Sequence, residues 1–408
     1  MEKVHEVAVA FYRQLFISQN GGNLANIDHL LTRHLDTNSQ AAQKIAFINE
    51  NVKRCLFSMT RNKAPGPDDW SFLRAMLIRV GFSSNWVSII MNYVEFVTYL
   101  LLINGDQVGY ITPGRGLRQG HPLSPYLFII CTEGLISLLK EACSSGELKG
   151  IKVGPSLEPM THLMFVDDTL LLGSATLSEA AKFKSILDIY ESWSGQLVNA
   201  QKSTLLFRPN VSGTTRVAIL AMLGMTEVNS HEKYLGLPTT IASSKKKVFS
   251  TIVDRVKAKV ANWKPRILST TGKEVFIISV LQSISTFTMK YFRLPLQTCN
   301  EINFILANFW WGSDTSNKKK IHWLTWQCLC KQKSEGGMGF RDTQSFNQAL
   351  LWKQAWKLIT EPNSPLSQVY KDRYFPRTSF WAAQLGPKPS YTWRSILSAK
   401  DLICKGLE

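Results

Sequence analysis

Cysteine is scarce in this 408-residue sequence, and its distribution argues against a disulfide framework. The seven cysteines are an odd number, scattered along the chain at positions 55, 131, 143, 299, 328, 330 and 404. This pattern fits a reducing compartment. His322, Cys328 and Cys330 come nearest to a metal cluster, but no second spaced pair of ligands follows, as a four-coordinate zinc site requires.

Long hydrophobic runs are also absent. The most apolar stretches, Phe96–Ile103 and Val275–Val280, are far shorter than the roughly 20 residues that a membrane-spanning helix needs. The first six residues include charged side chains where a secretory signal needs an apolar segment. We therefore expect an intracellular protein, in nucleus or cytoplasm, that neither enters a membrane nor needs a stable protein partner.

Acidic residues are few only in the last part of the chain. The whole sequence has 47 Lys and Arg against 30 Asp and Glu, a net charge of +17. Residues 1–242 contain 21 basic and 20 acidic residues, whereas residues 243–408 contain 26 and 10. A near-neutral unit followed by a basic region indicates an anionic partner, which the charge alone leaves open among nucleic acid, a phospholipid surface and an acidic protein.

Hydrophobic residues make up 45% of the chain, enough for a large core and enough to exclude a disordered protein. About two or three domains or subdomains are expected at this length. Apolar spacing predicts helices in the first sixty residues, with Val4, Val7, Phe11 and Leu15 on one face. The Pro-Gly-Pro run within Asn62–Asp68 interrupts this helical pattern.

The next elements follow from periodicity and from turn residues. Helices are predicted from Trp70 to Gly81, over Trp86–Phe96 and over Ser178–Trp193, and a β-hairpin over Tyr99–Ile111. A glycine-rich loop, Pro113–Pro125, leads into a further helix with Ser124 as the expected N-cap and Pro125 as its first residue. Free backbone N–H groups at that helix start would suit a phosphate or a template backbone, while an ordinary capped helix is the alternative.

Two adjacent carboxylates form the most informative segment. Asp167 and Asp168 lie between two apolar runs that are too short for helices, which predicts a buried β-hairpin with the acids at its tip. Like charges at the edge of a core repel unless a cation neutralises them. Carboxylate oxygens are ligands that Mg²⁺ prefers, so the hairpin is a candidate phosphoryl-transfer centre, although acids at turns are also common without any function.

Further along, three segments present basic or aromatic side chains. Lys202 follows a turn, Tyr234–Pro238 predicts a short strand and turn, and Lys245–Asn262 predicts a basic amphipathic helix. Arg255 and Lys259 lie on the polar side of that helix, which would suit phosphate contact or an anionic membrane. The many tryptophans after Trp263 are expected mainly in the core, with base stacking as the alternative.

The order of these motifs resembles the reverse transcriptase of non-LTR (LINE-type) retrotransposons, especially those of plants. The resemblance covers nearly the whole chain and rests on five segments in sequence: Asn62–Asp68, Arg115–Phe128, Phe165–Asp168, Ser194–Ser203 and Tyr234–Pro238. The C-terminal motifs, Trp263–Ser269, Asn308–Gly312, His322–Cys330 and Gly336–Asp342, look like the region that follows the polymerase in the same elements.

The resemblance implies an α+β fold with a right-hand polymerase-like palm and partial fingers, a helical thumb, and a Trp-rich, mainly helical C-terminal region. It implies a helical fingers remnant over residues 1–61, fingers and palm over 62–240, a basic thumb over 241–300 and a connection region over 301–408. The implied reaction is RNA-directed DNA synthesis on an RNA template and a DNA primer. Deoxynucleoside triphosphates would be the substrates and Mg²⁺ or Mn²⁺ the metal.

The resemblance also implies roles for individual residues. Asp167 and Asp168 match the catalytic, metal-binding pair, with Asp167 as the principal ligand. The match extends to Arg118, Gln119 and Gly120 for template and nucleotide, to Lys202 for triphosphate charge, and to Tyr234, Leu235 and Gly236 for the primer grip. Residues on the thumb helix would follow the duplex backbone: Lys245, Lys246, Lys247, Arg255 and Lys259.

One family feature is missing from the sequence. The family carries a third aspartate on a separate palm strand, shortly before a Trp-Ser-Phe-Leu segment, and the equivalent position here is Gly66 in the Pro-Gly-Pro loop. We infer an internal deletion and expect C-terminal truncation before a zinc-binding segment. Three interpretations stay open: an active enzyme that recruits Asp68 or Asp69, a non-catalytic nucleic-acid-binding remnant, and a chain that does not fold stably.

Overall fold

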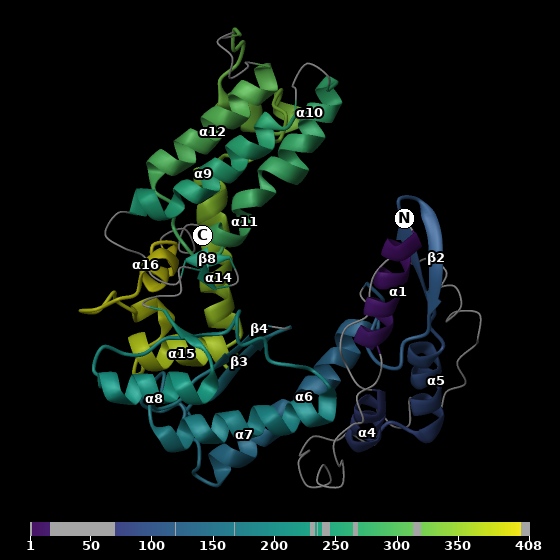
Figure 1. The fold of residues 1–408 in the computed structure, drawn as a ribbon. Coiled ribbons are helices and arrows are strands. Elements are labelled where there is room, and N and C mark those ends of the chain that lie inside the picture. The colour runs from purple at the N-terminus through teal and green to yellow at the C-terminus, as the bar shows by residue number, and fades with distance from the viewer. Residues whose placement is uncertain are drawn as a thin grey trace. The chain divides into compact units, whose positions relative to one another are not determined.

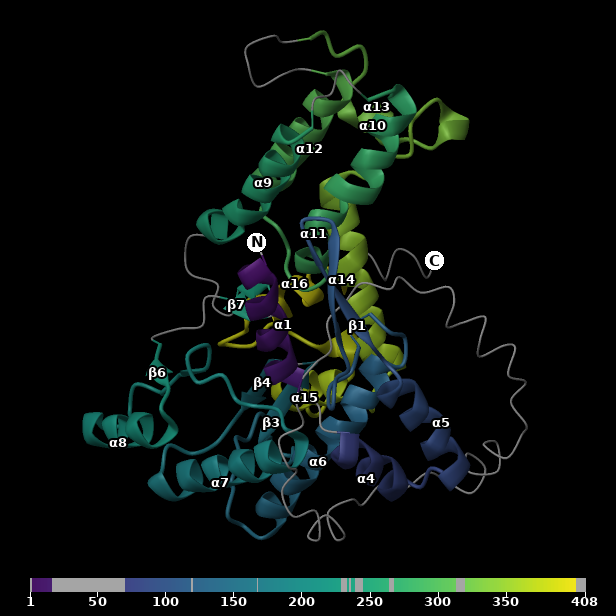
Figure 2. The same ribbon diagram turned by 45° about the vertical axis from the view of Figure 1, so that its right-hand side comes forward.

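The chain folds into two compact units in a computed structural model (Figures 1 and 2). The structure describes residues 2–16, 70–118, 120–166, 168–228, 233–234, 236–238, 245–263, 268–312 and 320–400. The first unit comprises Met1–Ile151 and Pro159–Asn229, and the second comprises Lys152–Glu158 and Ser230–Glu408. Residues 17–69, which include part of the helical region predicted for the first sixty residues and the Asn62–Asp68 loop, lie outside the described residues.

Helices dominate the first unit, and its strands form small two-stranded sheets. Its helices are α1 (Glu2–Phe16), α4 (Trp70–Val80), α5 (Ser84–Glu95), α6 (Ser124–Ser144), α7 (Leu177–Ser194) and α8 (Gly213–Leu223). Its strands are β1 (Tyr99–Ile103), β2 (Asp106–Ile111), β3 (His162–Phe165), β4 (Asp168–Leu171), β5 (Thr204–Leu205) and β6 (Thr226–Glu227). The pairs β1–β2 and β3–β4 are antiparallel, whereas β5–β6 is parallel.

Packing of α4, α5, α6 and α7 forms the core of the first unit. Phe72 on α4 is fully buried and meets the ring of Tyr190 on α7 edge to face, with centroids 6.0 Å apart. The absence of a side chain at Gly134 lets α6 approach Phe72, because a Cβ there would lie only 3.0 Å from its ring. The helix that begins at Trp70 ends before Gly81, as predicted, and Gly81 adopts a φ of 99°.

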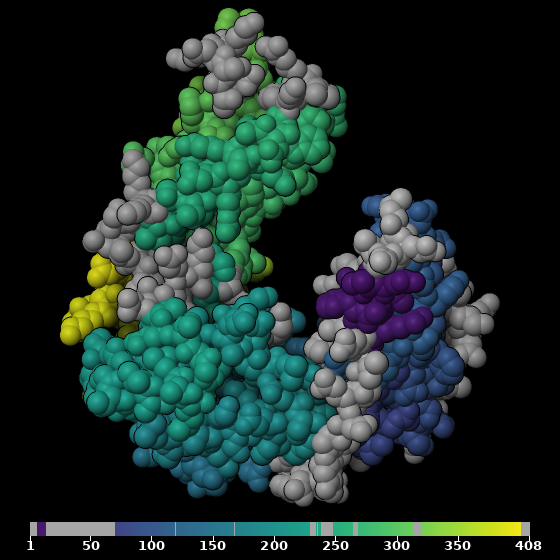
Figure 3. All heavy atoms as spheres, viewed as in Figure 1, coloured from purple at the N-terminus to yellow at the C-terminus, as the bar shows by residue number. Residues whose placement is uncertain are grey.

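The first helix does not bury the face that periodicity predicts. Val7 and Phe11 of α1 are 69% and 60% exposed, whereas Val9 contacts Gly109 of β2. In the space-filling view, α1 (purple) lies on the surface of its unit against the blue hairpin (Figure 3). Gly109 has a φ of 64° and offers no Cβ, so the helix approaches the strand on a different side from the one predicted.

The second unit is almost entirely helical. Its one sheet among the described residues pairs β7 (Lys233–Tyr234) with β8 (Leu237–Pro238). Its α-helices are α9 (Lys245–Ala261), α10 (Thr270–Phe276), α11 (Ser283–Met289), α12 (Leu296–Trp311), α13 (Trp326–Cys330), α14 (Thr343–Thr360), α15 (Pro365–Tyr374) and α16 (Tyr391–Leu397). A π-helix spans Ile277–Leu281, and 3₁₀ turns span Lys333–Glu335 and Phe380–Ala382.

Two apolar clusters stabilise the second unit. Helices α9 and α12 lie side by side in both views (Figures 1 and 2), and Lys257 forms an ion pair with Glu301 at 2.7 Å between them. The other cluster surrounds Trp393, which is fully buried and stacks on Tyr374 with centroids 4.7 Å apart. Trp310, Trp311, Trp326 and Trp352 pack against these clusters as predicted, whereas Trp323 is 76% exposed and Trp356 and Trp381 are also exposed.

A short segment from the middle of the sequence belongs to the second unit. Within Lys152–Glu158, the backbone N–H of Ser156 donates to the carboxylate of Asp372 on α15 at 3.2 Å. The hydroxyl of Ser156 donates to the same carboxylate. The second unit is thus assembled from two separate stretches of sequence.

The fold is mixed α+β, with small sheets and a large helical content. The finer division into fingers, palm, thumb and connection regions stays a prediction. Among the described helices, none combines the length and the apolar character needed to cross a bilayer.

Candidate active site

The predicted acidic hairpin is present. Strands β3 and β4 pair antiparallel, with Phe165 opposite Asp168 at the end of the hairpin. Val166 adopts a φ of 54°, a left-handed conformation that a β-branched side chain strongly disfavours. Asp167 itself lies outside the described residues. Asp168 is thus the first residue of β4, directly after the connection between the two strands (Figure 1).

The prediction that this hairpin is buried holds for one face only, on which Met164 and Leu171 pack against the core of the first unit. Phe165 is 57% exposed, and Leu163 and Val166 are also exposed. Among the described residues only β3 and β4 form this sheet, so no third strand covers their outer edges. The apolar runs that predicted a core position therefore reach solvent at the tip of the hairpin.

The carboxylate of Asp168 is exposed and open to ligands. Among the described residues it has no hydrogen-bond or ion-pair partner, so nothing in that part of the chain neutralises it. On β3, His162 pairs its Nδ1 with the Thr161 hydroxyl at 2.9 Å. Burial lowers the pKa of His162, Lys140 lowers it further and Glu133 opposes the change. His162 lies opposite Leu171, at the end of the hairpin away from Asp168.

The glycine-rich loop before α6 is held by its own polar groups. The Arg118 carbonyl accepts hydrogen bonds from the His121 backbone N–H at 3.3 Å and from the Ser124 hydroxyl at 2.7 Å. The Leu123 N–H donates to His121 Nδ1 at 3.2 Å. At the other end of the loop, the indole N–H of Trp70 donates to the Gly116 carbonyl at 3.0 Å.

This network corrects the predicted helix start. Leu123 is the N-cap of α6, Ser124 is its first residue, and Pro125 follows. The Ser124 hydroxyl donates to Arg118 instead of accepting a backbone N–H, so Ser124 is not the cap. The backbone N–H groups of Ser124, Tyr126 and Leu127 all bond to carbonyls nearby. The expected free N–H groups for a phosphate are therefore not present at this helix start.

The side chains that the resemblance assigns to nucleotide contact are only partly described. Arg118 is half-buried, Gly120 is exposed with a φ of 83°, and Gln119 lies outside the described residues. Burial lowers the pKa of His121, and the positive charge of Arg118 lowers it further. Burial raises the pKa of Tyr99, against the effect of Arg118. Arg118 thus creates a positive potential felt by both neighbouring rings.

Sequence reasoning missed the bonds that hold this loop. It treated Ser124 as a cap, yet the Ser124 hydroxyl and the His121 backbone N–H both donate to the Arg118 carbonyl. The signal was weak, because a serine before a proline is typical of a cap and gives no hint that its hydroxyl turns back toward the loop.

Lys202 is presented as predicted. The Asn199 carbonyl and side-chain oxygen both accept the Lys202 backbone N–H at 3.1 Å, which closes the turn before β5. The Lys202 side chain is exposed and has no ion-pair or hydrogen-bond partner among the described residues. Asp168 and Lys202 therefore share one unit and are both free to bind an added ligand, but no described contact joins them.

The primer-grip and thumb candidates lie in the second unit. Tyr234 pairs with Leu237 across a two-residue turn in which Gly236 adopts a φ of 77°, while Leu235 lies outside the described residues. On α9, the predicted apolar side is buried, including Phe249 and Val256.

The polar side of α9 presents positive charge to solvent. Arg255 and Lys259, four residues apart, are exposed and have no acidic partner among the described residues. Lys257 differs because it is paired with Glu301. The helix begins at Lys245, but the side chains of Lys245, Lys246 and Lys247 lie outside the described residues.

The donor set of the hairpin suits a hard divalent cation only in part. Carboxylate oxygens are suitable ligands for Mg²⁺, and the carboxylate of Asp168 is accessible. Within the described part of the chain, however, no group of three or more His, Cys, Asp or Glu side chains gathers in metal-binding geometry. Asp168 and the adjacent Asp167 could hold a metal together with water and substrate phosphates, without a third protein carboxylate from the described residues.

Comparisons with known proteins place the first unit in context. Residues 69–239 match the family model described as reverse transcriptase (RNA-dependent DNA polymerase). An uncharacterized mitochondrial protein of Arabidopsis thaliana is 43% identical over 126 residues, 31% of this chain and 81% of that protein.

Two longer relatives match over a minor part of their own length. A putative ribonuclease H protein of Arabidopsis thaliana is 35% identical over 168 residues, 40% of this chain and 26% of that protein. An uncharacterized 149 kDa protein of transposon TX1 from Xenopus laevis is 22% identical over 290 residues, 69% of this chain and 21% of that protein. The chain thus spans about a quarter or less of each of these two relatives.

Proposed function

Because this chain belongs to the reverse transcriptase family of non-LTR retrotransposons, we propose that it binds a template–primer duplex but transfers nucleotides poorly. The family relationship supports descent from an RNA-directed DNA polymerase. The observation that supports the proposal most directly is the β3–β4 hairpin. It presents Asp168 to solvent without a partner among the described residues, which leaves the carboxylate available to a metal. Among the same residues no third strand pairs with the hairpin to carry another carboxylate.

Asp167 and Asp168 are the proposed metal-binding residues. Reverse transcriptases generally use divalent metal ions, and two Mg²⁺ ions bound here would lower the pKa of a primer 3′ hydroxyl and neutralise charge on the transferred phosphoryl group. The exposed position of Asp168 leaves its oxygens available for this role. Arg118 and Lys202, whose side chains are basic, would bind the negative charge of the incoming triphosphate and of the template.

The missing third carboxylate is the proposed cause of weak catalysis. Counting back from Trp70 places Gly66 where the family has its aspartate, and the family match begins only at Asp69. The exposed Phe165 and Leu163 support this explanation, since one face of the hairpin packs on the core while these apolar residues on the other face have no covering element among the described residues. Electrostatic stabilisation usually dominates phosphoryl transfer, so losing one acid should reduce the rate strongly.

Primer extension on an RNA template with Mg²⁺ tests the catalytic part of the proposal. We expect the native chain to extend a DNA primer no faster than its Asp167→Ala variant. Extension by the native chain that the variant lacks would overturn the claim of impaired catalysis. The same assay with Asp68→Ala and Asp69→Ala would then show whether either of these acids has been recruited.

A second candidate function is nucleic-acid binding without any catalysis. Arg255 and Lys259 support it, because both point to solvent from a helix whose other side is firmly packed. Replacing both by alanine should weaken binding to a paired RNA–DNA hybrid about tenfold. It should also reduce the slope of log K against log salt concentration by the equivalent of about two phosphate contacts. The matched control is Lys257→Ala, since Lys257 is already paired with Glu301. Equal effects of the two changes would contradict the assignment.

A further inference from the structure

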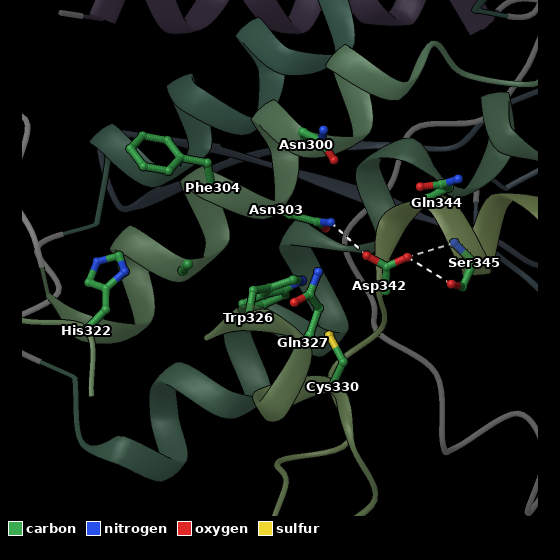
Figure 4. A pocket seen from close by; sticks show the side chains of 11 residues that line it. Asn300, Asn303, Phe304, His322, Trp326, Gln327, Cys330, Asp342, Gln344 and Ser345 are labelled. Atoms are coloured by element: carbon green, nitrogen blue, oxygen red, sulfur yellow. Dashed lines mark hydrogen bonds between the residues drawn. The ribbon is translucent and has the colours of Figure 1, made fainter. Parts of the chain in front are cut away.

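A polar cavity in the second unit has no role in the proposed polymerase chemistry. It has a volume of about 560 Å³ and lies between α12, α13 and the start of α14. Figure 4 shows Asn303, Asp342 and Ser345 joined by hydrogen bonds on one side, with Phe304 and His322 on the opposite side. All of these residues belong to the second unit.

Hydrogen bonds make one wall of the cavity rigid. The carboxylate of Asp342 accepts from the Asn303 side-chain amide at 2.8 Å and from the backbone N–H and hydroxyl of Ser345 at 2.8 and 2.9 Å. The Asn303 carbonyl oxygen accepts from the Thr343 hydroxyl at 2.6 Å. These groups position the start of α14 against α12, and they leave little capacity for a ligand.

Other polar groups in the cavity are not used by the protein. The side-chain amides of Asn300, Gln327 and Gln344 are exposed and have no hydrogen-bond partner among the described residues. The indole N–H of Trp326 is buried and also has no partner there. Burial and the nearby Asp342 raise the pKa of the Cys330 thiol to about 12, so this lining group is neutral. Amides and an N–H donor at this density suit a neutral ligand with several donors and acceptors.

Aromatic rings flank these polar groups. Phe304 is 63% exposed on the wall of the cavity, whereas Trp326 stacks on Phe340 with centroids 5.2 Å apart. The adjoining loop presents Trp323 to solvent, and its neighbour His322 stacks on Trp311 of α12 at 6.2 Å. A flat heterocycle could thus stack on Phe304 or on Trp323 while its edge meets the amides.

Positive charge lies at the C-terminal end of α12, where His322 stacks on Trp311. The ammonium groups of Lys320 and Lys273 both lie close to Gly312, the residue that ends α12. A Cβ built on Gly312 would lie 3.4 Å from Lys320 Nζ and 3.6 Å from Lys273 Nζ. Lys273 also donates to the Trp310 carbonyl at 3.3 Å. Two ammonium groups therefore lie beside residues Lys320–Thr325, here called the Trp323 loop. The wider region, residues 243–408, is also basic, with 26 basic against 10 acidic residues.

We propose that this cavity and the Trp323 loop bind single-stranded nucleic acid, with one unpaired base in the cavity and a neighbouring base stacked on Trp323. The free amides offer hydrogen bonds to a base edge, which is accessible in this way only when the base is unpaired. Lys273 and Lys320 bind the phosphates, because Asp342 makes the cavity itself unfavourable for an anion. A lipid surface explains Trp323 and the lysines, but it leaves the amides and the indole N–H of Trp326 without partners.

Fluorescence anisotropy with labelled 12-nucleotide oligo(U) and the full chain tests this proposal. Stacking contributes about 1–3 kcal/mol per base, so Trp323→Ala should weaken binding by about 5- to 150-fold. Phe304→Ala should weaken it by a smaller factor. Trp381→Ala, a change at another partly exposed tryptophan of the same unit, is the matched control and should bind as the native chain does. Equal affinity of the Trp323→Ala and Trp381→Ala variants would overturn the proposal.

Two further measurements separate this site from the alternatives. Arg255→Ala with Lys259→Ala should reduce binding to the paired hybrid more than binding to oligo(U), and Trp323→Ala should do the reverse, so failure of either proposal is visible on its own. Gln327→Leu should reduce differences in affinity among oligo(U), oligo(A) and oligo(C). Sedimentation with phosphatidylserine vesicles that depends on Trp323, without competition by oligo(U), would replace nucleic acid with a membrane as the partner and overturn the proposal.

Discussion

The two units differ in where their charged groups sit relative to a packed core. In the first unit, the acidic hairpin is a two-stranded sheet whose apolar side chains reach solvent. In the second, the basic helix α9 buries one whole side against α12 and presents Arg255 and Lys259 from a firm support. Catalysis tolerates little displacement of its groups, whereas phosphate binding tolerates much more. Loss of one strand can thus affect nucleotide transfer while duplex binding is retained.

The largest expected effect comes from removing the centre of each core. Phe72→Ala and Trp393→Ala each delete a fully buried ring, and each should cost about 3–5 kcal/mol in the free energy of unfolding. If the units are as distinct as their contacts indicate, each change should reduce hydrogen-exchange protection only in its own unit. Hydrogen exchange with peptide-level mass spectrometry measures this. Loss of protection in both units from one change would show a single cooperative core.

A smaller effect is expected from a buried amide in the second unit. Asn347 donates to the carbonyls of Met289 and Phe292, both at 2.9 Å, and accepts from the backbone N–H of Leu294 at 2.8 Å. Asn347→Ala should therefore cost about 3 kcal/mol, since buried backbone groups lose their partners. Urea unfolding gives the value, and the adjacent Gln348→Ala is the control. A cost in unfolding free energy below that of the control would mean that the segment Met289–Leu294 does not depend on its hydrogen bonds to Asn347.

Glycine at the strained turn should stabilise the first unit slightly. Val166 has a φ of 54°, and a left-handed backbone costs an L-residue about 1–2 kcal/mol. Val166→Gly removes that cost but adds freedom to the unfolded chain, which leaves a gain of about 1 kcal/mol or less. Asn104→Gly is the matched control, since Asn104 also has positive φ and asparagine tolerates it. A decrease in the urea midpoint for Val166→Gly would show that the valine side chain stabilises the turn.

Acid should weaken the first unit by the smallest amount. Burial is the main cause of a lowered pKa in both His121 and His162, so the folded unit binds fewer protons than the unfolded chain. The resulting stability is present above the unfolded histidine pKa of about 6.5 and is lost as pH falls through the lower folded values. Thermal unfolding between pH 7.5 and 5 should show this decrease. His121→Gln with His162→Gln should reduce the slope, and an unchanged slope would contradict the assignment.

Local patterns predicted the elements better than their surroundings. The hairpin over Tyr99–Ile111 and the helices from Trp70 and Ser124 follow from turn residues and apolar spacing, and the structure confirms them. Burial of Phe165 was predicted from its apolar neighbours, but burial requires a covering element, and among the described residues there is none. The prediction of which face of α1 is buried was wrong for the same reason. The position of Gly109 decides which side of the helix packs.

At the candidate site, too, local patterns predicted individual residues better than the contacts between them. Spacing identified Lys202 and Arg255 as charged groups presented to solvent, and both are exposed, but Asp168, predicted at the edge of a core, is exposed as well. The hydroxyl of Ser124 bonds to the Arg118 carbonyl, a contact across six residues that no local rule predicts. The cavity beside α12 joins Asn300 with Gln344, 44 residues apart, and only tertiary packing brings their amides together.

The contact between Ser156 and Asp372 determines how this protein can be divided. The seven residues Lys152–Glu158 lie inside the sequence of the first unit but belong to the second, where Asp372 binds the backbone and hydroxyl of Ser156. A gene fragment that begins at residue 230 encodes Asp372 without its donor, and one that ends at residue 229 encodes the donor without its acceptor. Expression of either half alone therefore truncates a unit, and recombination that exchanges the halves separates residues that pack together.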